Sequence, residues 1–190
     1  MRSFASIAAA ATLFSCLAHS RPISSPLKAR TNSGGECLTL ADAEYLVNGY
    51  ALLINSTYSY TRAADILAIN FIDYSDSVNF LAGVPLSTAI FTSLAQFDAS
   101  QSQQEPIPLQ VLSIDAVSCT NIAWRWLAYP GTGLYEVKGI NIIYAVQGTG
   151  KANGWQVGTN FAEFNSAAWD LDIGGTCVPP TAPAKLFKKI

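Results

Sequence analysis

Apolar residues recur with a helical period in the first half of the chain. The clearest stripe consists of Ala43, Leu46, Val47, Tyr50, Leu53 and Ile54. These spacings of three and four predict an amphipathic helix with one buried face. Thr39-Leu-Ala-Asp42 precedes the stripe and is close to a capping box, with Asp where Glu is usual. A shorter helix is predicted over about 61–69, and a weaker one over 93–103.

Beyond residue 108 the pattern becomes that of a sheet. Four runs rich in Val, Ile, Trp, Tyr and Thr have the length of strands: Leu109–Ser118, Thr120–Tyr129, Leu134–Gln147 and Gly154–Phe164. Glycine-rich loops separate the last three runs, which predicts an antiparallel meander. Helices followed by such a sheet indicate an α+β fold.

The strand that contains Trp124 and Trp126 is apolar on both faces. A sheet of this kind needs a cover on each side. The helices supply one cover, and either the Asn165–Val178 segment or a second subunit supplies the other.

Polar chemistry concentrates in Asn70-Phe-Ile-Asp-Tyr-Ser-Asp-Ser-Val-Asn79, which is predicted to start as a strand and to be broken by 81–85. It places Asp73, Tyr74 and Asp76 beside apolar residues. Residues three apart in a strand point to opposite faces, so at most one of the two carboxylates should face an interior. The alternative is structural, because Asp and Ser commonly cap turns at such junctions.

The N-terminal residues resemble a secretory signal peptide. Met1-Arg2 is followed by an apolar run over 4–18 and by Ala18-His19-Ser20. The run is shorter than the roughly 20 residues that a membrane-spanning helix needs. The sequence therefore predicts a secreted, extracellular protein with a signal peptide at 1–20, a disordered leader at 21–35, one domain at 36–178 and a flexible tail at 179–190.

Removal of this peptide would take His19, the chain's one histidine, out of the protein. That argues against His-based catalysis and a zinc enzyme site, so neither a metal nor a cofactor is predicted. Cys37, Cys119 and Cys177 would remain, and two of them are expected to form a disulfide, with the pairing open. Asn55-Ser-Thr57 is a glycosylation sequon at the end of the first helix.

Charge narrows the range of partners. Between residues 36 and 178, four basic residues face all 13 acidic ones, a balance of −9. Such a domain repels phosphate backbones and anionic bilayers, so neither nucleic acid nor a membrane is expected as a partner.

Several motifs together resemble the secreted NTF2-like domain proteins of filamentous fungi. They are Cys37, the 70–79 stretch, Gly83-Val-Pro85, Ile122-Ala-Trp-Arg-Trp126, Val137-Lys-Gly-Ile140 and Glu163-Phe-Asn-Ser-Ala-Ala-Trp169. The resemblance implies an NTF2-like (cystatin-like) cone, with N-terminal helices on a curved antiparallel sheet around an apolar pocket. That group is largely without an assigned activity.

Three functions follow as hypotheses. The first is binding of a small apolar ligand in the cone, with Tyr50, Trp124, Arg125, Trp126, Phe161 and Glu163 as candidate contacts. The second is a cofactor-free isomerase, cyclase or dehydratase, in which Asp76 or Asp73 is the base and Tyr74 or Tyr50 donates a hydrogen bond. The third is an interaction protein that forms a homodimer through the outer face of the sheet.

For several of these residues a structural role is the alternative. The tryptophans fit a packed core better than a cofactor site, although a few of them would line any pocket. Arg125 is expected to pair with Glu163 across the meander or to stack on an aromatic ring.

Overall fold

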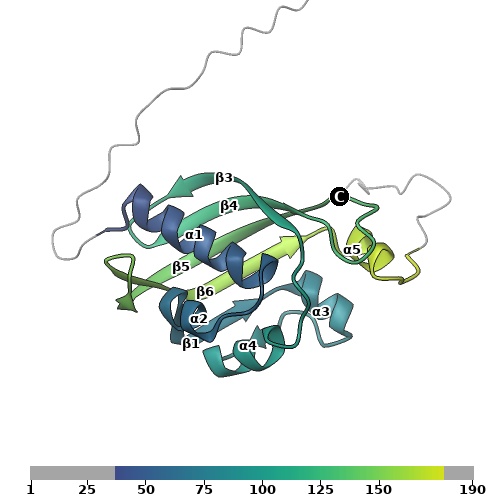
Figure 1. The fold of residues 1–190 in the computed structure, drawn as a ribbon, viewed down its shortest axis with the longest axis horizontal. Coiled ribbons are helices and arrows are strands. Elements are labelled where there is room, and N and C mark those ends of the chain that lie inside the picture. Colours follow the sequence, from purple (N-terminus) through teal and green to yellow (C-terminus); the bar gives the residue numbers. More distant parts are fainter. Residues whose placement is uncertain (1–36, 178–190) are drawn as a thin grey trace, which may run out of the picture.

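The computed structural model describes residues 37–177, drawn in Figure 1. Their elements follow in the order α1 (Leu40–Asn55), α2 (Tyr60–Ile66), β1 (Leu67–Tyr74), α3 (Asp76–Ala82), β2 (Ala89–Phe91), α4 (Leu94–Gln101), β3 (Leu109–Val117), β4 (Asn121–Ala128), β5 (Val137–Gly150), β6 (Gly154–Phe164) and α5 (Ser166–Asp172). The predicted signal peptide, the leader and the tail lie outside the described residues.

Helix α1 begins where the capping pattern predicts. The Thr39 hydroxyl accepts a hydrogen bond from the Asp42 amide at 3.1 Å, and the Asp42 carboxylate accepts one from the Thr39 amide at 2.9 Å. Two amides that the helix cannot satisfy internally are thereby paired. The buried face of α1 includes Leu46 and Val47, as the periodicity predicts.

The junction after the second helix differs from its prediction. Helix α2 ends at Ile66 and β1 occupies 67–74, so the predicted extension of the helix to residue 69 is wrong. The 70–79 stretch then divides into the end of β1 and a new helix, α3. Ser75 caps α3 by accepting a hydrogen bond from the Val78 amide at 3.0 Å, and Gly83 ends it with a φ of 66°.

The strands form one curved sheet in the order β2-β1-β6-β5-β4-β3. Strands β3 to β6 pair antiparallel in succession, which confirms the predicted meander and the α+β class. Strand β1 joins the other side of β6 in parallel. Helix α1 lies across one face, with α2 and α4 below it and α5 at one end (Figure 1).

The two faces of the sheet differ in their cover. Trp124 and Trp126 point toward the helices and are 1% and 5% exposed. On the outer face Ile140, Ile142 and Tyr144 are 54%, 43% and 44% exposed. The segment after residue 164 does not cover this face, because α5 packs its Trp169 ring on Phe164, whose ring contacts Trp126 on the inner side. Of the two covers predicted for the second face, the segment, in its described part 165–177, is therefore excluded, and the second subunit stays a prediction.

A disulfide connects Cys37, ahead of α1, to Cys119 in the turn between β3 and β4. The Leu38 amide also donates to the Cys119 carbonyl at 3.0 Å. Cys177 is a free cysteine. Among the helices of residues 37–177, none is both long enough and apolar enough to span a membrane.

Candidate functional site

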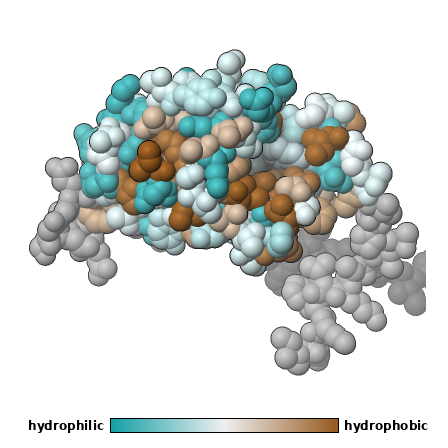
Figure 2. All heavy atoms as spheres, turned by 90° about the horizontal axis from the view of Figure 1, so that it is seen from below, coloured by the Kyte–Doolittle hydropathy of each residue, from teal (hydrophilic) through white to brown (hydrophobic). Residues whose placement is uncertain are grey.

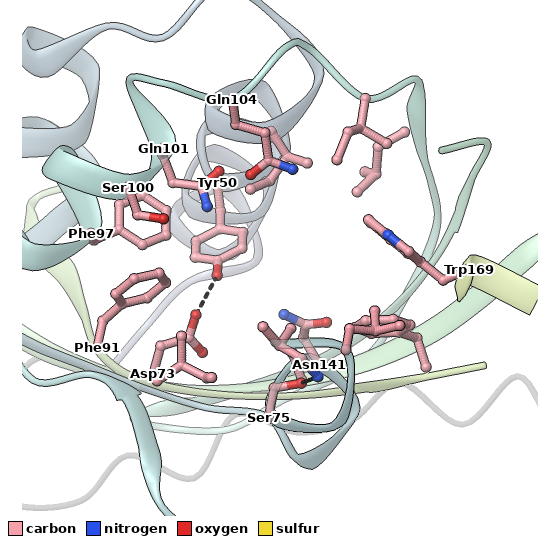
Figure 3. Close-up of a pocket in the computed structure, with 18 of the residues that line it drawn as sticks. Tyr50, Asp73, Ser75, Phe91, Phe97, Ser100, Gln101, Gln104, Asn141 and Trp169 are labelled. Carbon is pink, nitrogen blue, oxygen red and sulfur yellow. Dashed lines mark hydrogen bonds between the residues drawn. The ribbon is translucent and has the colours of Figure 1, made fainter. Parts of the chain in front are cut away.

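A cavity of about 360 Å³ lies between the inner face of the sheet and the helices. Most of its wall is apolar, and aromatic rings from several elements contribute to it: Tyr50, Phe91, Phe97, Trp124, Trp126, Phe164 and Trp169 (Figure 3 draws most of the lining residues). Figure 2, a view from below, shows apolar patches among hydrophilic ones on the surface. Exposed apolar residues of α3 and the loop after it include Phe80, Val84 and Leu86. An aromatic wall of this kind suits a small, mainly apolar molecule.

Asp73 is the acidic residue in the cavity wall. It lies near the end of β1 and is 7% exposed. Its Oδ1 accepts a hydrogen bond from Asn160 Nδ2 at 2.8 Å, and its Oδ2 accepts one from the Tyr50 hydroxyl at 3.4 Å (Figure 3). Burial raises the pKa of Asp73 to about 7, although these hydrogen bonds favour the charged form. The carboxyl can therefore gain or lose a proton near neutral pH.

Tyr50 belongs to the buried face of α1 and is 6% exposed. Burial and then the nearby Asp73 charge raise the pKa of its phenol well above the ordinary value. The phenol therefore remains protonated and can donate a hydrogen bond. Asn160 Nδ2 lies 3.2 Å from the phenol oxygen and donates to it as well.

Two asparagines that the sequence interpretation missed extend this arrangement. Asn141 Nδ2 donates to Asn160 Oδ1 at 2.9 Å, and Trp126 Nε1 donates to Asn141 Oδ1 at 2.6 Å. Both asparagines are at most 2% exposed. Because each amide oxygen is already occupied, the amide of Asn160 is oriented with its NH₂ toward Asp73 and Tyr50.

A signal for Asn141 exists in the sequence. Strand β5 alternates, with Val137, Asn141 and Ile143 facing in and apolar Ile140 and Ile142 facing out. An asparagine flanked by outward isoleucines inverts the usual pattern, and such an inversion marks a buried polar position.

Four of the candidate residues line the cavity, namely Tyr50, Asp73, Trp124 and Trp126. Tyr74 and Phe161 do not line it. Their rings stack on each other at 5.1 Å, beside Tyr144 on the outer face.

Arg125 is also on the outer face, where Nε lies 2.7 Å from Asp115 Oδ2. The predicted pair between Arg125 and Glu163 is wrong. In the register of the sheet both residues are opposite Ile140, one on each side, so strand β5 separates them. Each residue has a partner of its own instead: Arg125 pairs with Asp115, and the Glu163 carboxylate accepts hydrogen bonds from backbone amides.

Glu163 and Asp76 hold the start of α3 in place. The Glu163 carboxylate accepts hydrogen bonds from the amides of Asp76 at 2.9 Å and Ser77 at 3.0 Å. Asp76 Oδ1 accepts a hydrogen bond from the Ser87 amide at 2.5 Å. Neither carboxylate lines the cavity, so Asp73 rather than Asp76 is the carboxylate that the fold directs inward.

Within residues 37–177 no group of three or more His, Cys, Asp or Glu side chains is placed to hold a metal ion.

Asn55, the asparagine of the glycosylation sequon, lies at the end of α1 and is half-buried. Its Nδ2 donates a hydrogen bond to the Leu109 carbonyl at 3.0 Å.

A family model described as an NTF2-like domain matches residues 36–176. The chain belongs to this family. In the comparison with curated protein sequences, none matches this chain.

Solved structures with low sequence identity resemble this NTF2-like domain. IdmH, a putative polyketide cyclase from Streptomyces antibioticus, is 12% identical, with a TM-score of 0.52 over 70% of this chain and 98% of that one. A protein of unknown function with a cystatin-like fold from Methylobium petroleophilum is 13% identical, with a TM-score of 0.47 over 78% of this chain and 99% of that one. At such identity the likeness shows the fold alone.

Proposed function

We propose that the cavity of this NTF2-like domain binds a small, mainly apolar molecule and that Asp73 exchanges a proton with it. The observation that supports the proposal is one buried carboxyl, with a pKa near 7, in a wall made largely of aromatic and aliphatic side chains. A carboxylate in contact with water is fully ionised at neutral pH. This one is balanced between its two forms, as a general acid or base needs to be.

The chemistry that suits this site is proton transfer next to a carbonyl group. Ionised Asp73 takes the proton of the breaking C–H bond, and the electron pair moves onto the carbonyl oxygen as an enolate. This step requires a molecule with a C=C bond beside the carbon that loses the proton, so that the enolate is conjugated with that bond. The same carboxyl then returns the proton to the far carbon of the C=C bond. The double bond moves next to the carbonyl group, and the molecule is isomerised without any change in redox state. Tyr50 is the neighbouring phenol, and a hydrogen bond from it to the enolate oxygen would stabilise the developing charge.

Binding without turnover is the second candidate, and the same cavity supports it. One experiment separates the two. Small molecules that co-purify with the protein are identified by mass spectrometry, and the molecule is then incubated in D₂O with the wild type and with Asp73→Asn.

Deuterium in the molecule with the wild type and none with Asp73→Asn supports proton transfer. Unchanged molecule recovered from both proteins assigns the domain to binding alone. If no co-purifying molecule is found and screened apolar compounds do not bind, the whole proposal is overturned.

Secretion and dimer formation are separate proposals. The Cys37–Cys119 disulfide is compatible with an oxidising compartment, and together with the apolar N-terminal run it supports a secreted protein. Sequencing the N-terminus of the exported protein tests this proposal, since cleavage after Ser20 is expected. The same sample shows whether Asn55 carries a glycan.

A second copy of the chain is the partner that we propose for the outer face of the sheet. An exposed strip there consists of Ile140, Ile142, Tyr144, Val146 and Phe161, which are 39% to 54% exposed. Adjacent apolar residues on one face are a common feature of interfaces, and a twofold axis lets one such strip cover another.

A further inference from the structure

None of the described residues that line the cavity is basic. Of the residues that line it, Asp73 and Tyr50 are those with an ionisable side chain, and neither can carry a positive charge. In the described part of the chain Arg125 pairs with Asp115 on the outer face, and Lys138 pairs with Glu136. Arg62 donates to Ser56 at 3.2 Å, and Lys151 is exposed.

The polar groups that do line the cavity lie on two opposite walls. Asp73, Ser75 and Asn141 belong to the sheet side, whereas Gln101 and Gln104 come from α4 and the turn after it. Figure 3 shows the two glutamines and Ser100 across the open space from Asp73 and Ser75. Hydrogen-bonding groups are therefore present at both ends of an otherwise apolar volume.

An anion would bind poorly in such a site. It would give up its hydration on entering the cavity, and no basic side chain would compensate for that loss. The ionised form of Asp73 would repel it, and so would the domain's balance of −9 over residues 36–178. A neutral molecule incurs neither cost, and it can accept hydrogen bonds from glutamine amides at one end while it faces Asp73 at the other.

We propose that the cavity selects neutral molecules with an apolar body and oxygen-bearing groups at both ends, and that it rejects carboxylates, sulfonates and phosphates of the same shape. This inference rests on the proposed binding function and adds the charge of the ligand to it. Molecules carried as phosphate esters or as phosphate-bearing thioesters are then excluded as substrates.

Two dyes with the same aromatic skeleton provide the test. N-phenyl-1-naphthylamine is neutral, and 8-anilino-1-naphthalenesulfonate adds one sulfonate group. Fluorescence titration at pH 8 and 150 mM salt is expected to give a dissociation constant at least tenfold lower for the neutral dye. The ratio should become smaller with Asp73→Asn, because that substitution removes the negative charge in the cavity wall and keeps the shape.

Introducing a cation provides the converse test. Gln101 lines the cavity, whereas Gln103 is exposed nearby and does not line it. Gln101→Arg is expected to tighten sulfonate binding at least tenfold, and Gln103→Arg, the matched control, should leave it unchanged. Equal tightening by both variants, or equal affinity of the wild type for the two dyes, would overturn the charge selection.

Failure of the binding proposal itself gives a different result. Ala162 lines the cavity from β6, and Ala123 lies on the outer face of β4, opposite Ile142. Ala162→Leu should weaken binding of the neutral dye, while Ala123→Leu should not. If Ala162→Leu has no effect on either dye, then the cavity does not bind apolar molecules and the proposed function fails together with its charge preference.

Discussion

Asp73 and Asn160 are register partners on the parallel strands β1 and β6, and the Asn160 amide donates to the Asp73 carboxylate over 2.8 Å. This contact links residues 87 positions apart in the sequence. Because the oxygen of the same amide accepts from Asn141, the amide cannot rotate without the loss of both bonds. Asp73 is thus held at the cavity wall by a neutral donor, which leaves its pKa governed mainly by burial.

The stability of the protein should depend on pH through Asp73. Its pKa is raised from the ordinary 3.8 to about 7 in the folded state, so the folded protein retains a proton that the unfolded chain releases. The contribution of Asp73 to the free energy of unfolding should therefore fall by roughly 4 kcal/mol as the pH rises from about 4 to about 7, and this contribution is constant outside that window. Urea unfolding of the wild type across this range measures the slope.

Asp73→Asn is the comparison for that measurement. The amide keeps an acceptor for Asn160 and has no proton to lose in this window. As the pH rises from 4 to 7, the wild type should lose unfolding free energy through Asp73, whereas the variant should not. The variant should therefore become more stable relative to the wild type over this range. If the two curves stay parallel, Asp73 titrates at its ordinary value.

Glu163→Gln should destabilise the start of α3. The Glu163 carboxylate accepts hydrogen bonds from the backbone amides of Asp76 and Ser77 at the start of this helix. The neutral amide oxygen of Gln would be a weaker acceptor for them. We expect a loss of about 1–2 kcal/mol in the free energy of unfolding. Because α3 supplies Val78 and Leu81 to the cavity wall, binding of N-phenyl-1-naphthylamine should weaken as well.

Glu136→Gln is the matched control for that substitution. Glu136 pairs with Lys138 at 3.4 Å, and both side chains are more than half exposed. Exposed pairs of this kind contribute little, so a change below about 0.5 kcal/mol is expected. An equal loss in both variants would show that α3 does not depend on the Glu163 carboxylate.

Replacing Cys37 with Ser should lower stability by about 4 kcal/mol, because the disulfide closes a long loop in the unfolded chain. Cys37 and Cys119 are separated by 82 positions. Urea unfolding without reductant measures the effect, and Cys177→Ser, which removes a free thiol, should have little effect. Reductant should abolish the difference between the wild type and Cys37→Ser.

Ile142→Lys should convert a dimer into a monomer if a second copy covers the outer face. Ile142 is 43% exposed and lies in the middle of the strip on β5 and β6. Sedimentation velocity is expected to show a dimer for the wild type and a monomer for this variant. Lys151→Glu, which alters an exposed residue beyond the strip, is the control. A monomeric wild type leaves the face to a different partner and contradicts the proposal.

Periodicity and turn chemistry in the sequence predict much of this fold. The stripe from Ala43 to Ile54, the cap at Thr39 and the hairpin loops beyond Pro130 are local patterns, since each depends on residues a few positions apart. The two ends of α3 are also locally encoded, its start by Ser75 and its end by Gly83, but the polar density of 70–79 favours a strand interpretation there.

The arrangement of the site could not be predicted from such local patterns. Which of Asp73 and Asp76 faces inward depends on where β1 ends, and the pKa of Asp73 depends on the side chains that bury it. Arg125 and Glu163 have complementary charges, but the register of β5 keeps them apart.

The sequence by itself determined the α+β class, the order of helices before strands and a carboxylate beside an apolar interior. The tertiary structure decided that Asp73 is that carboxylate, that Asn141 and Asn160 orient its partners, and that no basic side chain enters the cavity from the described residues. The physical reason is that secondary structure follows short-range patterns, whereas burial and charge pairing depend on strands brought together from distant parts of the chain.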